Sequence, residues 1–164
     1  MKRLLIVFLS GLSFSFGQNS IEDAINQYNS NSVAYINVEM LDRELQSKEN
    51  LILLDTRSKA EFDVSHLKNA VWVGYDEFNL NTVKHLSKTS EIVVYCSIGV
   101  RSEEVGEQLQ QAGFLNVKNL YGGLFKWFNK GFKVYNLSGT ATKKVHPYNK
   151  FWGMFLINAE KSYH

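Results

Sequence analysis

The only cysteine of the chain, Cys96, lies in a segment whose residue types suit nucleophilic sulfur chemistry. It follows the apolar run 92–95, which is typical of a buried strand, and a thiolate at such a strand end is a strong nucleophile. Gly99 supplies a backbone conformation that other residues resist. Arg101 offers a planar donor fork for an oxyanion such as thiosulfate. We expect the segment 96–101 to lead directly into a helix.

A loop between a strand and a helix favours a negatively charged sulfur. Backbone N–H groups of a tight loop form an anion-binding nest, and the following helix adds the positive end of its dipole. Both features favour the thiolate of Cys96 over the thiol. Glu103 and Glu104 stand in the first turn of that helix, and we expect both to point to solvent. The alternative is that Cys96 is an inert core residue that ends the strand.

The composition is that of an ordinary globular protein. The chain has 164 residues, of which 45% are hydrophobic and 21% charged, so one domain with a hydrophobic core is expected. The sequence contains no basic stripe with interleaved aromatic residues, which is the pattern that would indicate nucleic-acid binding. A lone cysteine forms no internal disulfide, and no group of His, Cys or carboxylate residues has metal-ligand spacing. We therefore expect neither a metal ion nor a cofactor.

The first residues have the pattern of a secretory signal peptide. Lys2 and Arg3 form a basic start, an apolar stretch runs over 4–16, and small residues follow at the positions that a signal peptidase prefers. We predict cleavage near Gly17–Gln18 and an exported, periplasmic or secreted protein. The alternative is an uncleaved membrane anchor, but the apolar stretch is short for a span that needs about 20 residues. Removal of this peptide brings the formal charge from +2 to zero.

Short apolar runs alternate with helical periodicity from residue 34 onwards. Strands are predicted within 34–36, 51–54, 70–73, 92–95 and 116–120. Helices are predicted after the N-cap residues Ser20 and Asn37, and over 101–112 and 122–129. Apolar strands separated by helices indicate a parallel sheet that is covered on both faces. Ligands bind such sheets at the carboxyl ends of the strands, here just after Asp55 and Tyr95.

Five sequence blocks, in the right order over about 100 residues, resemble the rhodanese-like family. Two departures lie in a surface turn, where Ser65 replaces the usual Gly, and Lys68 and Asn69 replace Pro-Gly. The blocks are Leu53–Ser58, then Glu61-Phe62 with His66-Leu67 and Ala70, then Val93–Ser102, then Ala112–Val117, and then Tyr121–Leu124 with Trp127.

The resemblance implies an α/β fold with a central five-stranded parallel sheet and a cysteine that accepts sulfane sulfur as a persulfide. Cys96 is then the catalytic residue. Four residues separate Cys96 from Arg101, the length associated with sulfur transfer, whereas related phosphatase and arsenate-reductase domains have five. The residues that would cradle the substrate, mainly through backbone N–H groups, are Ser97, Ile98, Gly99, Val100 and Arg101.

Four polar residues near the second strand are expected to have structural roles beside the site. Asp55 ends that strand and is a hydrogen-bonding residue in the family more often than a catalytic one. We expect Arg57 and Glu61 to form an ion pair that braces the turn. His66 is expected to order the local turn rather than to act as a general base, because no triad spacing supports it.

The predicted organisation has four parts. These are a signal peptide over 1–17, an N-terminal segment with a short helix over 18–33, a rhodanese domain over 34–135 and an aromatic extension over 136–164. The extension is too apolar to remain fully exposed to solvent. It either docks on the surface of its own domain, or it shapes the mouth of the Cys96 pocket or contacts a partner.

The predicted function is that of an exported sulfurtransferase without a stable membrane anchor. Its thiolate would take sulfur from a thiosulfate- or polysulfide-like donor and pass it from a Cys96 persulfide to a thiol, to cyanide or to a protein acceptor. Two alternatives stay open. One is a non-enzymatic binding module in which Cys96 is a relic, and the other is a persulfide carrier that serves one partner protein.

Overall fold

The computed structural model describes residues 20–48 and 50–164. The predicted signal peptide therefore lies outside the described residues.

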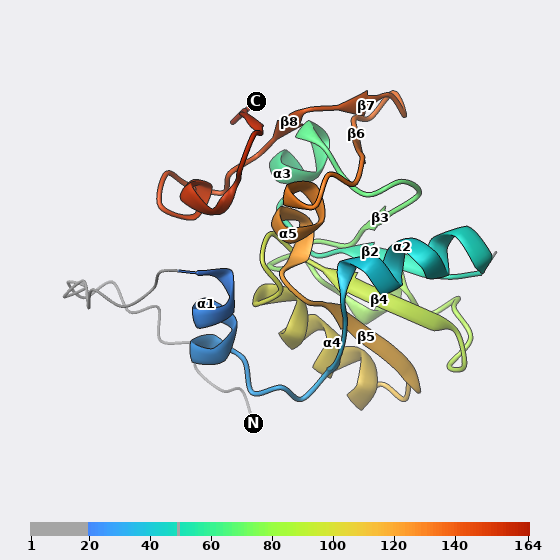
Figure 1. Ribbon diagram of the computed structural model, residues 1–164. Coiled ribbons are helices and arrows are strands. Elements are labelled where there is room, and N and C mark those ends of the chain that lie inside the picture. Colours follow the sequence, from blue (N-terminus) through green and yellow to red (C-terminus); the bar gives the residue numbers. More distant parts are fainter. Residues whose placement is uncertain (1–19, 49) are drawn as a thin grey trace.

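A parallel sheet with the strand order β1-β5-β4-β2-β3 forms the centre of the molecule (Figure 1). The central strand β4 pairs with β2 from Ile52 opposite Ile92 to Asp55 opposite Tyr95. This register ends both strands at the same edge, where the N–H of Thr56 donates to the Tyr95 carbonyl at 2.9 Å. The predicted five-stranded parallel sheet is confirmed. The strands are β1 (Ala34–Ile36), β2 (Ile52–Asp55), β3 (Val71–Trp72), β4 (Glu91–Tyr95) and β5 (Asn116–Leu120).

Helices cover both faces of this sheet, with α4 on one face and α2 and α5 on the other (Figure 1). Ser20 caps α1 by accepting from the N–H of Asp23, and Asn37 caps α2 by accepting from the N–H of Met40, as predicted. A 3₁₀ turn, η1 (Leu80–Thr82), precedes β4. The helices are α1 (Ile21–Tyr28), α2 (Val38–Ser47), α3 (Lys59–Val64), α4 (Arg101–Gln111) and α5 (Gly123–Asn129).

The alternation of side chains along β4 divides the core into two layers. Ile92 and Val94 join the cluster that contains Val105 and Leu109 of α4. Val93 and Tyr95 point to the opposite face and join the cluster formed with α2 and α5. A central parallel strand must be apolar on both faces, which explains the continuous run that the sequence shows here.

The C-terminal segment after α5 docks on the same domain. Strand β6 (Val134–Tyr135) pairs antiparallel with β7 (Ala141–Thr142), and β8 (Lys144–Val145) pairs parallel with β9 (Glu160–Lys161). A 3₁₀ turn, η2 (Trp152–Phe155), lies between β8 and β9. Val145 and Leu156 are buried within the core cluster on the α5 side of the sheet. The extension is therefore part of the folded domain, which confirms the first of its two predicted interpretations.

Candidate active site

Cys96 lies at the end of the central strand, where the backbone turns tightly around its sulfur. Its side chain is 1% exposed, and the N–H of Gly99 donates to Sγ at 3.1 Å. Gly99 has a φ of +98°, and a Cβ there would lie 3.1 Å from the Leu120 carbonyl oxygen. Glycine therefore allows the turn that aims its N–H at the sulfur, where the bond stabilises a negative charge.

The N-terminal end of α5 holds the back of this loop. The N–H of Leu124 donates to the Cys96 carbonyl, and that of Phe125 donates to the Ser97 carbonyl, each at 2.9 Å. Gly123 has a φ of +56°, and a Cβ there would lie 2.4 Å from the Cys96 carbonyl oxygen. The contact needs glycine, although sequence reasoning used Gly123 only as a part of the family resemblance.

Two asparagines fix the Gly99 carbonyl, and sequence reasoning missed both. Asn119 at the end of β5 donates to it at 2.8 Å, and Asn29 just after α1 donates to it at 2.9 Å. The amide oxygen of Asn119 accepts from the hydroxyl of Ser102 at 2.7 Å. Asn116 and Lys118 of the same strand are also polar, so the sequence pattern alone does not single out the buried Asn119.

Glu61 reaches the loop from α3. Its carboxylate accepts two bonds from the Arg101 guanidinium, at 2.9 and 2.8 Å, and one from the Ser97 hydroxyl at 2.7 Å. Its Oε2 also accepts from the N–H of Ser58, which completes a capping box at the start of α3. Arg101 was expected to offer its donor fork to an oxyanion, but the structure shows that fork bound to Glu61.

The charges of this group are strongly coupled. Burial by itself would raise the pKa of Glu61, but the hydrogen bonds and positive charge of Arg101, with help from Arg57 and Ser97, lower that pKa to about 2. Although burial opposes it, Glu61 in turn raises the pKa of Arg101. Glu61 and Arg101 therefore form an ion pair whose net charge is zero beside the sulfur.

The predicted ion pair between Arg57 and Glu61 is wrong. Arg57 is fully buried and binds Asp55, with its Nη2 at 2.7 Å from Oδ2, and also donates to the Ser65 carbonyl at 2.6 Å. The cause is local geometry. The capping box turns the Glu61 side chain toward the Cys96 loop, while the Arg57 side chain turns into the domain. Asp55 thus has the structural role that was expected.

The prediction that Glu103 points to solvent is also wrong. Glu103 is 3% exposed, and its carboxylate accepts from the backbone N–H of Ser32 at 2.8 Å and from its hydroxyl at 3.0 Å. The segment that precedes β1 covers this side of α4, a contact that the sequence of α4 does not reveal. His66 behaves as expected, because its Nδ1 lies 3.0 Å from the Phe62 carbonyl and its ring stacks on the Phe62 ring.

A pocket of about 220 Å³ opens above Cys96. Ser97, Ile98, Val100 and Arg101 line it, so four of the five predicted cradle residues meet there, and Gly99 donates to the sulfur beneath. Three aromatic side chains from outside the loop complete the lining: Tyr28, Tyr148 and Trp152.

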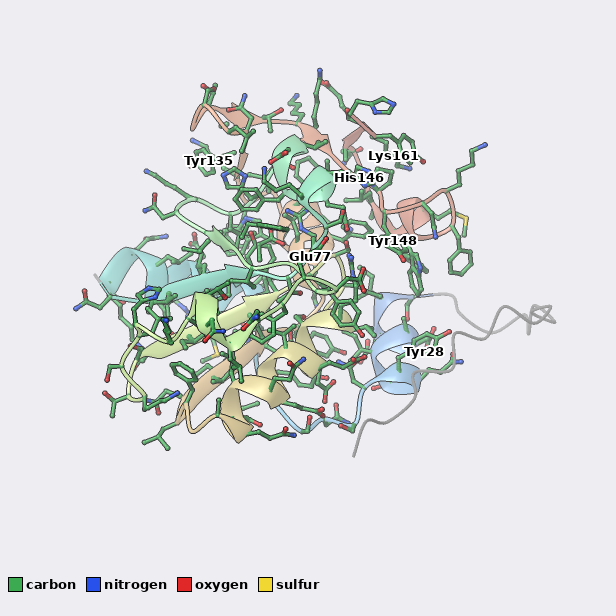
Figure 2. All side chains as sticks on the ribbon, turned by 180° about the vertical axis from the view of Figure 1, so that it is seen from behind. Tyr28, Glu77, Tyr135, His146, Tyr148 and Lys161 are labelled. Atoms are coloured by element: carbon green, nitrogen blue, oxygen red, sulfur yellow. The ribbon has the colours of Figure 1, made fainter. Side chains whose placement is uncertain are left out.

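These aromatic residues come from both flanking segments of the chain. Tyr28 ends α1, whereas Tyr148 and Trp152 belong to the C-terminal extension, and Figure 2 shows Tyr28 and Tyr148 on the same side of the molecule. The extension therefore also shapes the mouth of the Cys96 pocket, which was the second interpretation of its role. Which of its aromatic residues would do so was not predictable, because the sequence carries no signal of where the extension docks.

Within the described part of the chain, no three His, Cys, Asp or Glu side chains gather into a group that could hold a metal ion. No helix there is both long and apolar enough to cross a membrane.

The comparisons with known proteins agree with the geometry. The rhodanese-like domain family matches residues 37–130. A tRNA uridine(34) hydroxylase from Aster yellows witches'-broom phytoplasma is 38% identical over 99 residues, which is 57% of this chain and 32% of that protein. The adenylyltransferase and sulfurtransferase UBA4 of Candida albicans is 32% identical over 93 residues, which is 52% of this chain and 21% of that protein.

The chain thus matches a third or less of the length of these two relatives, so the similarity concerns the domain. A crystal structure of the BH2092 protein from Bacillus halodurans has the same fold, with a TM-score of 0.60 at 24% identity. The match covers 72% of this chain and 88% of that one. With its sheet order and its family match over 37–130, this chain belongs to the rhodanese-like domain family.

Proposed function

We propose that this protein is an exported sulfurtransferase that carries sulfane sulfur on Cys96. One observation carries the proposal. The sulfur of Cys96 lies at the floor of a pocket, where the N–H of Gly99 donates to it at 3.1 Å. The same N–H that stabilises the thiolate lies beside the anion that forms when a second sulfur is attached.

The sulfur enters by nucleophilic displacement. With thiosulfate as donor, the Cys96 thiolate attacks the outer sulfur, a new Sγ–S bond forms, and the S–S bond of the donor breaks. Sulfite leaves with the electron pair, and Cys96 holds a persulfide anion. In the second half of the cycle, a nucleophile such as cyanide or a thiolate attacks the outer sulfur of the persulfide and regenerates the Cys96 thiolate.

The experiment is thiosulfate-to-cyanide sulfur transfer by the purified protein, with Cys96→Ser as the control. The intact mass is recorded after exposure to thiosulfate. We expect turnover and an added mass of about 32 Da in the wild type, and neither in the variant, because one sulfur atom binds the thiolate. The intact mass also tests export, since a cleaved chain begins near Gln18.

Each other outcome assigns a different function. A mass adduct without turnover would identify a persulfide carrier that needs its partner protein. If the folded and reduced protein gives neither an adduct nor turnover, the enzyme proposal fails, and the function that remains is that of a non-enzymatic binding module.

Export is proposed from the N-terminal sequence. Lys2 and Arg3, the apolar stretch 4–16 and the small residues that follow have the pattern of a signal peptide.

A further inference from the structure

The lining of the Cys96 pocket offers little net charge to a strongly charged donor. As far as the described residues define it, the pocket has one charged lining residue, Arg101. The carboxylate of Glu61 holds the guanidinium by two bonds at 2.8 and 2.9 Å. A dianion such as thiosulfate would enter next to an arginine whose charge Glu61 already neutralises, so the pair adds no net positive charge to the pocket.

Two further polar groups of the pocket floor are likewise engaged. The Ser97 hydroxyl donates to Glu61 at 2.7 Å, and the Gly99 N–H donates to the Cys96 sulfur. The guanidinium of Arg101 also lies over the Tyr148 ring, 4.7 Å from its centroid, so an aromatic face covers it on another side. The polar side chains of the floor are thus bound to one another, and the side-chain surface that is left for the rest of a donor is mainly apolar.

The rim of the pocket is aromatic, and its residues come from outside the family match at 37–130. Tyr28 is 53% exposed and Tyr148 is 46% exposed, and Trp152 lies with them along the pocket. Exposed aromatic side chains that line one pocket provide flat surfaces for an apolar group. Because an apolar cavity of roughly 150 Å³ holds benzene, a pocket of about 220 Å³ has room for a ring and a sulfur atom.

We propose that the sulfur donor of this protein is an organic sulfane, a monoanion whose outer sulfur is bonded to an inner sulfur that carries an apolar group, and this group packs on Tyr28, Tyr148 and Trp152. This inference rests on the proposed function and specifies its substrate class. For a thiosulfonate, R–SO₂–S⁻, the Cys96 thiolate attacks the outer sulfur, the S–S bond breaks, and the sulfinate R–SO₂⁻ leaves with the electron pair. For an organic persulfide, R–S–S⁻, the leaving group is the thiolate R–S⁻.

The test compares two thiosulfonates of equal charge, benzenethiosulfonate and methanethiosulfonate, with cyanide as the common acceptor. For each donor, kcat/KM reports the first half-reaction. We expect the wild type to prefer the benzene compound by about tenfold or more, the range typical of a well-filled apolar pocket. Thiosulfate, the dianion, is the third donor and is expected to give the lowest kcat/KM.

Two variants locate this preference. Trp152→Ala and Tyr28→Ala are each expected to lower the ratio of the two kcat/KM values several-fold. Tyr28 is half exposed at the end of α1, so its removal leaves the core intact and covers the case in which Trp152→Ala fails to fold. Met154→Ala is the matched control, because Met154 belongs to the same 3₁₀ turn as Trp152, is 64% exposed and lies outside the pocket lining. It should leave the ratio unchanged.

The outcomes separate this inference from the proposed function. If all three donors give the sulfur adduct on Cys96 but the wild type shows no preference, sulfur transfer stands and the organic donor is overturned. If both Trp152→Ala and Tyr28→Ala keep the wild-type preference for the benzene compound, the proposed role of these aromatic residues is overturned as well. If no donor forms the adduct, both proposals fail.

Discussion

At the scale of single residues, the notable arrangement is a carboxylate placed beside the sulfur that the proposed reaction uses as a nucleophile. Glu61 would repel a Cys96 thiolate if its charge stood alone. Arg101 neutralises it and joins it to Ser97 within the loop, since the Arg101 Nη2 also donates to the Ser97 hydroxyl at 3.0 Å. The ion pair thus ties α3 to the loop without adding net charge near the sulfur.

Replacing Glu61 by Gln should destabilise the fold in a pH-dependent way. Folding lowers the pKa of Glu61 from its ordinary value of 4.5 to about 2, which corresponds to about 3 kcal/mol of stability. This contribution is complete above the unfolded pKa and is lost as the pH falls from about 4.5 toward 2. Denaturant unfolding should therefore show a large difference between wild type and Glu61→Gln at pH 7 and a smaller one at pH 3.

Asp63→Asn is the control for this experiment. Asp63 lies on the same helix and forms an ion pair with Lys59, but both side chains are partly exposed, so its removal should have little effect at either pH. An equal loss of stability for Glu61→Gln at pH 7 and pH 3 would show that the ion pair does not contribute through the charge of Glu61.

The residues of the loop were predictable, but their partners were not. Cys96, Gly99 and Arg101 are placed by a strand, a turn and a helix that are local in sequence. The partner of an arginine depends on which carboxylate the tertiary fold brings closest. Arg57 binds Asp55 two residues away, and Glu61 binds Arg101 from another element, whereas the predicted pair was Arg57 with Glu61.

At the scale of elements, the loop is held between β4 and the start of α5. The carbonyls of Cys96 and Ser97 accept from the N–H groups of Leu124 and Phe125, so this part of the loop backbone faces the helix. The close approach depends on the missing side chain of Gly123. The sequence predicted both elements to within about one residue, yet it could not show that they touch, because that contact forms only when β5 pairs beside β4.

Gly123→Ala should therefore slow persulfide formation on Cys96. The new Cβ would lie 2.4 Å from the Cys96 carbonyl oxygen and 2.7 Å from the Ile98 nitrogen, so the loop must shift. Misplacement of reacting groups by about an ångström costs up to about a hundredfold in rate. We expect a loss of about tenfold or more in the rate at which thiosulfate adds sulfur, measured by mass against time.

Gly131→Ala provides the matched control. Gly131 also has a left-handed φ, +85°, but a Cβ there meets no atom within 4 Å. Both variants carry the conformational strain of about 1–2 kcal/mol, and only Gly123→Ala displaces the loop. Equal persulfide formation in the two variants would rule out α5 as the support of the loop.

At the scale of the whole molecule, the C-terminal extension completes both the core and the pocket. Val145 and Leu156 are buried with residues of the sheet and α5, and Tyr148 and Trp152 line the pocket above Cys96. The apolar composition predicted that the extension docks. Its docking site was beyond sequence reasoning, because short strands such as β8 and β9 have no periodicity long enough to identify them.

If the extension folds together with the domain, a substitution within it should destabilise the whole protein. Leu156 is 4% exposed, so Leu156→Ala should lower the free energy of unfolding by about 3 kcal/mol in a single cooperative transition. The neighbouring Ile157 is 59% exposed, and Ile157→Ala should cost far less. A separate early transition in which only the extension unfolds would contradict this expectation.

The pocket is assembled from two sources that are independent in sequence. Its floor comes from the loop at 96–101, inside the family match, and its aromatic rim comes from Tyr28, Tyr148 and Trp152, outside it. Mutations in the flanking segments can thus alter which molecules reach the sulfur while the displacement at the sulfur stays the same. Under the proposed function, substrate choice and catalytic chemistry are therefore encoded by separate stretches of the chain, and selection can act on each separately.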